Sequence, residues 1–381
     1  MRIRAIATIA AAVGILFAAI FIAGFFFSDD RLEVPVTLFY DDKDISGAVV
    51  SKQALQSVVL AMEFFNARSK THRFIPTRES DMNVYNAIER AAARKSAAVI
   101  GGINAPFASL LADASRRQGI SFISLASGHS LARPDDLVFR PRPENGGREL
   151  GEEARDRGIK AYAVIVSGFA ASHVQDFIRD FQSAIGTPPL KIVSFSSDLK
   201  TRIEDLQDYA QDMDAVLLVL PDWLCSVALR ELRHRFPGIP VFLSNWAVSH
   251  RIPLLAGPLG DGAFTASYTD IAWDSPGNEF VRFVRNTYTS SIPRMILAIG
   301  YDTVAMLDAA VKMSGSSDKQ AVATALSELE SVETIGGVFP VDKNGDLRHR
   351  GQIFTLRSGH WARGGAASDT SSSARPGGVV P

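Results

Sequence analysis

The chain has 381 residues, a net charge of −1 from 40 basic and 41 acidic side chains, and 46% hydrophobic residues. This composition is typical of a globular protein, and the balanced charge gives no electrostatic support to nucleic-acid binding. Because the length exceeds what one hydrophobic core usually covers, two lobes are expected.

An apolar segment near the amino terminus, residues 5–27, contains no charged residue. As a helix it would span about 34 Å, enough to cross a bilayer core of about 30 Å. Arg2 and Arg4 precede it, and Asp29 and Asp30 follow it. The positive-inside rule therefore predicts that residues 1–30 form an inner-membrane anchor, with the amino terminus in the cytoplasm and the folded part in the periplasm.

A cleaved signal peptide is the alternative interpretation of this segment. Such peptides have a shorter apolar core, about 7–15 residues, and small residues at the cleavage site. Here the apolar segment ends in the bulky run Gly24-Phe25-Phe26-Phe27, which favours an uncleaved anchor. Cleavage would release the same folded part into the periplasm, so both interpretations place it across the membrane.

After the anchor, short apolar runs alternate with amphipathic segments, which is the pattern of parallel sheets covered by helices. The pattern is interrupted at Pro141-Arg142-Pro143 and then restarts, which predicts two doubly wound α/β units of similar size. Residues 364–381 are rich in Gly, Ala, Ser and Pro and are predicted to be disordered. Strands are predicted at residues 34–40, 97–101, 120–125, 161–166, 190–195, 215–220, 241–243, 263–268, 337–340 and 351–356. Helices are predicted at residues 51–67, 107–117, 172–184, 202–211, 224–235, 278–288, 295–313 and 318–329.

The sequence carries none of the common catalytic motifs. It has no Gly-x-Ser-x-Gly elbow, no His-Glu-x-x-His and no Walker loop. His129 and His173 fall at predicted strand ends and could reach a cleft, but a surface position is the simpler interpretation. The single cysteine, Cys225, excludes an internal disulfide and a cysteine-based zinc site, and its apolar neighbours predict burial. We therefore expect no enzyme activity, no bound metal and no cofactor.

Five stretches resemble one known family when their order and spacing are taken together. They are Leu-Ala-Met-Glu-Phe-Phe-Asn-Ala at 60–67, Val-Ile-Gly-Gly at 99–102 followed by 118–124, Val-Phe-Arg at 138–140, Tyr-Asp-Thr at 301–303, and Asp-Lys-Asn-Gly-Asp at 342–346. They resemble the leucine/isoleucine/valine-binding family of type I periplasmic binding proteins over residues 34–361. No single stretch is specific to that family.

The resemblance implies an α/β fold of two Rossmann-like lobes with parallel sheets, joined by a three-strand hinge that closes on a ligand. Lobe one would combine residues 32–141 with 274–335, and lobe two would combine 142–273 with 336–363. Ligands of open parallel sheets lie outside the carboxyl ends of the strands, where backbone N–H groups and helix dipoles favour an anionic or polar group.

The resemblance also implies which residues would line the ligand site. Amino-acid binders of this family hold the ligand carboxylate with two lobe-one loops and the ammonium with an acidic residue of lobe two. The hydroxyl positions of the loops fall on Ala105 and Gly128, and the acidic position falls on Trp246. An ammonium buried without an anionic partner is costly, so a free α-amino acid is not expected to be the tightest ligand. The expected ligand-binding residues are Asn104, Ala105, Ala126, Ser127, Gly128, Phe169, Asp222 and Trp246.

Two functions remain open at this point. The first is a solute-binding protein that presents a small molecule, amino-acid-like or aromatic and apolar, to an ABC importer. The alternative is a membrane-tethered sensor or envelope scaffold that uses the same fold with a degenerate pocket. An extracytoplasmic enzyme has no support beyond the cleft that the fold would contain, because fold alone does not set function.

Overall fold

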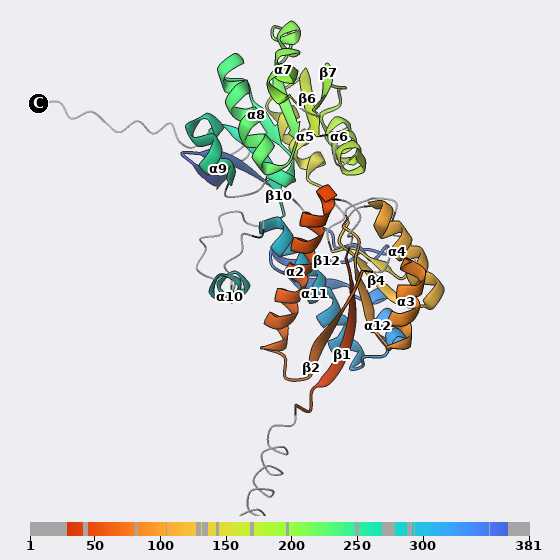
Figure 1. Ribbon diagram of the computed structural model, residues 1–381. Helices are drawn as coiled ribbons and strands as arrows, with labels where there is room; N and C mark the ends of the chain where they lie inside the picture. The colour runs from red at the N-terminus through yellow and green to blue at the C-terminus, as the bar shows by residue number, and fades with distance from the viewer. Residues whose placement is uncertain are drawn as a thin grey trace, which may run out of the picture.

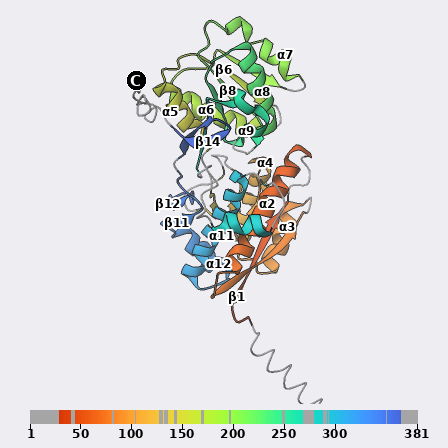
Figure 2. The same cartoon turned by 90° about the vertical axis from the view of Figure 1, so that its left-hand side faces the viewer.

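The chain forms two α/β lobes that stand one above the other (Figures 1 and 2). The computed structural model describes residues 29–40, 45–80, 83–103, 105–126, 131, 136–141, 145–167, 171–195, 198–247, 251–268, 279–287, 292, 294–349 and 351–364. Both lobes are built on a central sheet, which confirms the expected α/β class with parallel sheets.

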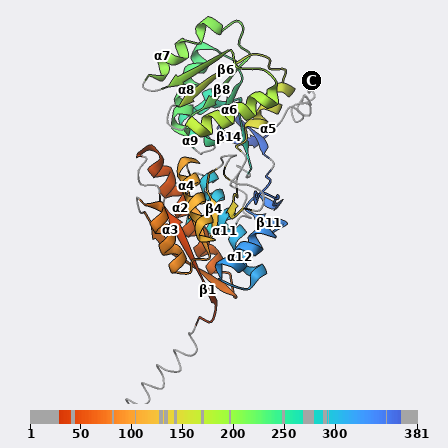
Figure 3. The ribbon, with the colours of Figure 1, turned by 90° about the vertical axis from the view of Figure 1, so that its right-hand side faces the viewer.

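The first sheet has five strands in the order β2-β1-β3-β4-β5, and all of its neighbouring pairs are parallel. Helices cover both of its faces (Figure 3), with α2 and α11 packed on one face and α3 and α4 on the other. The strands are β1 (Leu32–Phe39), β2 (His72–Glu79), β3 (Ala98–Gly101), β4 (Ser121–Ser124) and β5 (Val138–Phe139). The helices of this lobe are α2 (Ile45–Asn66), α3 (Val84–Ala93), α4 (Ala105–Gln118), α10 (Glu279–Thr287), α11 (Arg294–Ser314) and α12 (Lys319–Ser327).

The second sheet has seven strands in the order β14-β13-β10-β9-β8-β6-β7. The five strands from β10 to β7 are parallel, and β13 and β14 add two antiparallel strands at one side. Its strands are β6 (Tyr162–Ser167), β7 (Lys191–Phe195), β8 (Ala215–Val219), β9 (Val241–Leu243), β10 (Ala263–Ser267), β13 (Gln352–Arg357) and β14 (His360–Arg363). Its helices are α5 (Gly147–Asp156), α6 (Ala171–Ile185), α7 (Leu199–Glu204), α8 (Asp222–Arg235) and α9 (Arg251–Ala256), with short 3-10 turns η1 (Gln207–Tyr209), η2 (Asn245–Ala247) and η3 (Gly257–Gly260).

Helices α2 and α11 pack with their backbones close together. A Cβ atom on Gly300 would lie 2.3 Å from the Ser57 Oγ and 2.5 Å from the Ser57 carbonyl carbon. Only glycine allows this approach, and it brings the following residues of α11 against the sheet. Two residues after Gly300, Asp302 is fully buried, and its carboxylate accepts a hydrogen bond of 3.0 Å from the Ile335 backbone N–H.

Several elements differ from the sequence-based expectation. The helix expected at 202–211 is wrong, because Asp198 caps the helix α7 and starts it earlier; the 3-10 turn η1 then follows. The sequence pattern predicts neither β2 nor α3. The sequence of β2 contains Pro76 and charged residues, a pattern tolerated because β2 lies at the edge of its sheet.

The chain passes between the two lobes in three connecting segments. The first leads from β5 to α5, the second from β10 to α10, and the third from the hairpin of β11 (Ser331–Thr334) and β12 (Gly337–Pro340) to β13. The hairpin spans residue 336, where we expected the chain to pass from one lobe to the other, so the exact limits of the lobes stay a prediction.

Within the described part of the chain, no helix is long and apolar enough to cross a membrane. The anchor predicted at residues 5–27 and the tail predicted at 364–381, except for Gly364, lie outside the described residues.

Candidate ligand-binding site between the lobes

The carboxyl ends of the parallel strands in both lobes point toward the other lobe. Strand β1 runs from the lower end of the first lobe toward the second lobe, and the other strands of its sheet are parallel to it (Figures 1 and 3). In the second lobe, β10 ends where the chain returns to the first lobe, and β9, β8 and β6 run parallel to β10. Ligands of parallel α/β sheets bind at such strand ends, so the region between the lobes is the candidate site.

On the first lobe, the ends of β3 and β4 are held side by side. The Leu125 backbone N–H donates to the Gly101 carbonyl at 2.9 Å, and the Ala126 N–H donates to the Ser124 Oγ at 3.2 Å. Gly102 has a φ of +65°, and a Cβ atom there would lie 2.8 Å from the Ala108 Cα, so the turn into α4 requires glycine. This tight turn places the start of α4 at the strand end.

The predicted first-lobe residues are described only in part. Ala105 opens α4 directly after β3, and Ala126 follows β4 and is buried. Asn104, Ser127 and Gly128 lie outside the described residues. The structure therefore brings the two loop positions to one edge of the sheet, and the contacts of these side chains with a ligand remain a prediction.

Glu79 is the acidic residue at the end of β2 on this edge. Hydrogen bonds from Arg90 and, next in weight, Arg94 hold the pKa of its carboxyl below its usual range. Arg90 lies in α3 and Arg94 is the residue at its carboxyl end, so the Glu79 charge is compensated within the first lobe.

On the second lobe, Asp222 opens α8 after the end of β8, as the sequence predicted. Its carboxylate accepts a hydrogen bond of 2.7 Å from the Trp223 backbone N–H, and its carbonyl accepts one of 3.1 Å from the Ser226 hydroxyl. A carboxylate at the first turn of a helix is stabilised by the helix dipole. This local role accounts for Asp222 without a ligand.

Trp246 lies in η2, directly after β9, so its backbone is at the expected edge. Its neighbour Asn245 is only 6% exposed, and neither the Asn245 Oδ1 nor the Ser244 Oγ finds a hydrogen-bond partner in the described structure. Buried polar atoms are nearly always paired, so these two oxygens are able to hydrogen-bond a ligand group or a water molecule at the end of β9. Asn245 was not among the residues expected from the sequence; its position beside Trp246 at a strand end is the signal that could have found it. Phe169 lies outside the described residues.

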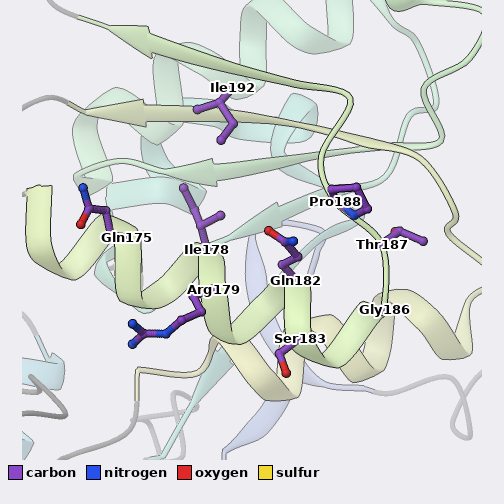
Figure 4. Close-up of a pocket in the computed structure, with 9 residues that line it drawn as sticks. All are labelled: Gln175, Ile178, Arg179, Gln182, Ser183, Gly186, Thr187, Pro188 and Ile192. Carbon is purple, nitrogen blue, oxygen red and sulfur yellow. The ribbon is translucent and has the colours of Figure 1, made fainter.

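Two hollows lie elsewhere on the molecule. One, of about 580 Å³, is on the outer face of the second lobe, where Ile178 of α6 and Ile192 of β7 point toward each other (Figure 4). The other, of about 540 Å³, lies in the first lobe between α2, α10 and α11 and includes Phe65 and Tyr301. Neither is lined by an expected ligand-binding residue. In the part of the chain that the structure describes, no group of three potential metal ligands comes together.

Comparison with known proteins agrees with this architecture. A family model for the periplasmic binding proteins matches residues 46–360, while a search of curated proteins finds no match. A solute-binding protein of an ABC transporter from R. palustris, solved in complex with benzoate, is 18% identical with a TM-score of 0.69 over 88% of this chain and 96% of that chain. A leucine-binding protein from Thermotoga maritima is 17% identical with a TM-score of 0.67 over 87% and 97%. A branched-chain amino acid transporter substrate-binding protein from Streptococcus pneumoniae, solved in complex with isoleucine, is 14% identical with a TM-score of 0.67 over 87% and 98%. At these identities the structures show a shared fold.

Proposed function

Because the chain belongs to the periplasmic binding protein family, we propose that it closes its two lobes on a small molecule in the periplasm and presents that molecule to an ABC importer. The family binds solutes and does not catalyse reactions on them, which agrees with the expectation from the sequence. The proposed lobes are residues 32–141 with 274–335 and residues 142–273 with 336–363; the strands of each of the two larger sheets fall within one of these two sets.

The proposed ligand is an aromatic or apolar acid. The carboxylate would be held by backbone N–H groups of the first-lobe loops at Asn104, Ala105, and 126–128, with the Ser127 hydroxyl. The ring would pack against Trp246 and Phe169, because aromatic side chains bind flat apolar groups well. The benzoate complex of the R. palustris relative supports this ligand class.

One observation carries this choice. At the end of β9, where the family resemblance places an acidic residue, this chain has Trp246, preceded by the buried and neutral Asn245. A neutral carboxamide can accept a hydrogen bond from a hydroxyl or amide group, but it does not compensate an ammonium charge. A free α-amino acid is therefore the weaker candidate.

The second candidate function is a tethered sensor or scaffold whose pocket no longer binds a solute. It is favoured by the two family hydroxyl positions that fall on Ala105 and Gly128, since neither residue has a side-chain donor.

A thermal-shift screen of the purified full-length chain in mild detergent tests both candidates. The panel contains benzoate, 3,4-dihydroxybenzoate, leucine, isoleucine and a set of sugars. A ligand at about 100 times its Kd adds about 2.7 kcal/mol to the free energy of unfolding, which raises the midpoint by several degrees. We expect a shift with an aromatic acid, its loss in Trp246→Ala, and its retention in Ile192→Ala, a matched change on the outer face. A leucine shift at micromolar concentration would overturn the ligand assignment, and no shift across the panel would favour the sensor or scaffold.

The proposed location is the periplasmic side of the inner membrane, with residues 5–27 as an uncleaved anchor. The family supports the periplasm, and the apolar segment supports the anchor. Fractionation of cells, followed by mass spectrometry of the protein's amino terminus, separates the alternatives. We expect the intact amino terminus in the membrane fraction; a processed protein in the soluble periplasmic fraction would establish a signal peptide.

A further inference from the structure

The three connecting segments between the lobes meet around one buried histidine, His349. It belongs to the third segment, and its side chain is 1% exposed. Its Nε2 lies 2.8 Å from the carbonyl oxygen of Pro141 in the first segment. Because a carbonyl can only accept, the His349 Nε2 carries the proton and donates this hydrogen bond. Two parts of the chain that are 208 residues apart are thereby joined between the lobes.

The His349 ring also contacts the second segment and the first lobe. Its centroid is 5.8 Å from the ring of Tyr268, which begins the second segment, and 4.3 Å from the ring of Phe339 on the β11–β12 hairpin. The Asp302 Oδ2 of α11 lies 3.8 Å from its Nε2. His349 is thus in contact with every connection between the lobes.

On the first-lobe side of His349, the first and third segments are joined rigidly. Arg140 and Asp346 form a buried bidentate ion pair, with the Arg140 Nε 2.6 Å from the Asp346 Oδ1. The backbones are also bonded there, from the Arg140 N–H to the Gly345 carbonyl and from the Leu347 N–H to the Arg140 carbonyl, each at 3.0 Å. These bonds join the third segment to Arg140, directly after β5 of the first lobe.

On the second-lobe side, the same two segments are attached to α5. The Gly351 N–H donates to the Glu149 Oε1 at 3.1 Å, and Gly146, with a φ of +83°, opens the turn into α5. Between these two sets of contacts the first and third segments pass from one lobe to the other. The hydrogen bond from His349 to Pro141 lies at this place.

We propose that His349 is the positioning residue of the hinge, and that its hydrogen bond to Pro141 sets the angle at which the two lobes stand. The inference rests on the proposed function only in that closure on a solute requires the lobes to turn about these segments. Loss of the bond changes the balance between lobe arrangements by roughly five- to tenfold, the usual net effect of one intramolecular hydrogen bond. A change of that size alters the apparent affinity for any solute that binds one arrangement.

The test measures the distance between the lobes in the absence of any solute. Spin labels are attached to cysteines introduced as Glu89→Cys on α3 and Arg230→Cys on α8, two exposed helix positions. The native Cys225 does not interfere, because it is fully buried and burial raises the pKa of its thiol. Pulsed electron resonance then gives the distance distribution in full-length protein.

Two substitutions distinguish an effect of His349 on the lobe arrangement from an effect on the stability of the fold. His349→Phe keeps an aromatic ring against Phe339 but lacks the donor, while His349→Gln keeps a donor at the position of the Nε2. We expect H349F to lower the ratio of the original lobe arrangement to the others by roughly five- to tenfold, and H349Q to restore that ratio. His349→Leu replaces the phenylalanine variant if that variant does not fold.

Three results would overturn the inference. They are an unchanged distribution in H349F with only a lower thermal midpoint, the same shift in H349Q as in H349F, or one narrow distribution in all of these proteins. Because no solute is present, these outcomes leave the ligand screen untouched. A failed ligand screen, in turn, leaves the distance measurement untouched.

Discussion

The buried ion pair between Arg140 and Asp346 gives the sharpest stability prediction. The two side chains are 4% and 2% exposed and form two hydrogen bonds between the first and third connecting segments. Asp346→Leu removes the carboxylate and leaves the guanidinium group buried without its counter-charge. Breaking a buried pair in this way costs about 3–5 kcal/mol, because the guanidinium group loses the carboxylate that offset its desolvation.

The expected loss corresponds to a fall in the thermal midpoint of roughly 6–20 °C. Circular dichroism at pH 7 measures it on the full chain. The matched control is Arg348→Gln, which breaks an exposed pair with Asp342, where the arginine side chain is 49% exposed. That pair is worth about 0–1 kcal/mol. The double variant Arg140→Met/Asp346→Leu should recover most of the loss, because an apolar pair leaves no buried charge. A loss in D346L below about 1 kcal/mol, as small as in the control, would refute the reasoning.

Three further predictions follow from the packing and the charges. Gly300→Ala should cost about 1–3 kcal/mol, since its methyl group would lie 2.3 Å from the Ser57 Oγ; an unchanged urea midpoint would show that α2 and α11 can separate freely. Cys225 should react with a chromogenic disulfide reagent only on unfolding, because burial raises the pKa of its thiol; fast labelling of the native protein would contradict this. The pKa of Glu79 is lowered mainly by Arg90, so its contribution to stability is present above the ordinary glutamate pKa and is lost as the pH falls through the lower, folded value. Glu79→Gln should therefore lower the thermal midpoint at pH 7 and have a smaller effect at pH 3, and equal effects at both pH values would contradict this.

The alternating pattern of the sequence predicted the strands that carry the candidate site. Strands β1, β3, β4, β6, β8, β9 and β10 are buried along most of their length, so each reads as a short apolar run between polar turns. Such runs are recognisable from one sequence, because parallel strands are covered on both faces. The positions of Asp222 and Trp246 at strand ends follow from the same pattern.

The edge strand β2 and the hinge could not be found in this way. The burial of β2 is irregular, and its sequence contains Pro76, so no period is visible. The hydrogen bond of His349 is to Pro141, 208 positions away, which no local pattern encodes. Asn245 was missed for a similar reason, since its unpaired oxygen is a property of its buried surroundings and not of its neighbours in the chain.

Asp302 belongs to the Tyr-Asp-Thr stretch at 301–303, which was singled out only because it resembles the family. The structure shows what its side chain contacts. Asp302 follows Tyr301 near the middle of α11, where a buried carboxylate has no part in helix formation and would be costly without partners. Its Oδ1 accepts the Ile335 N–H at the tip of the β11–β12 hairpin, which carries Phe339. The hairpin in turn places Phe339 against His349. Through these contacts Asp302 fixes the first-lobe side of the hinge. Asp302→Asn, which keeps an acceptor for Ile335, should therefore change the interlobe distance less than Asp302→Ala does. Equal changes in the two variants would mean that the carboxylate acts on His349 directly.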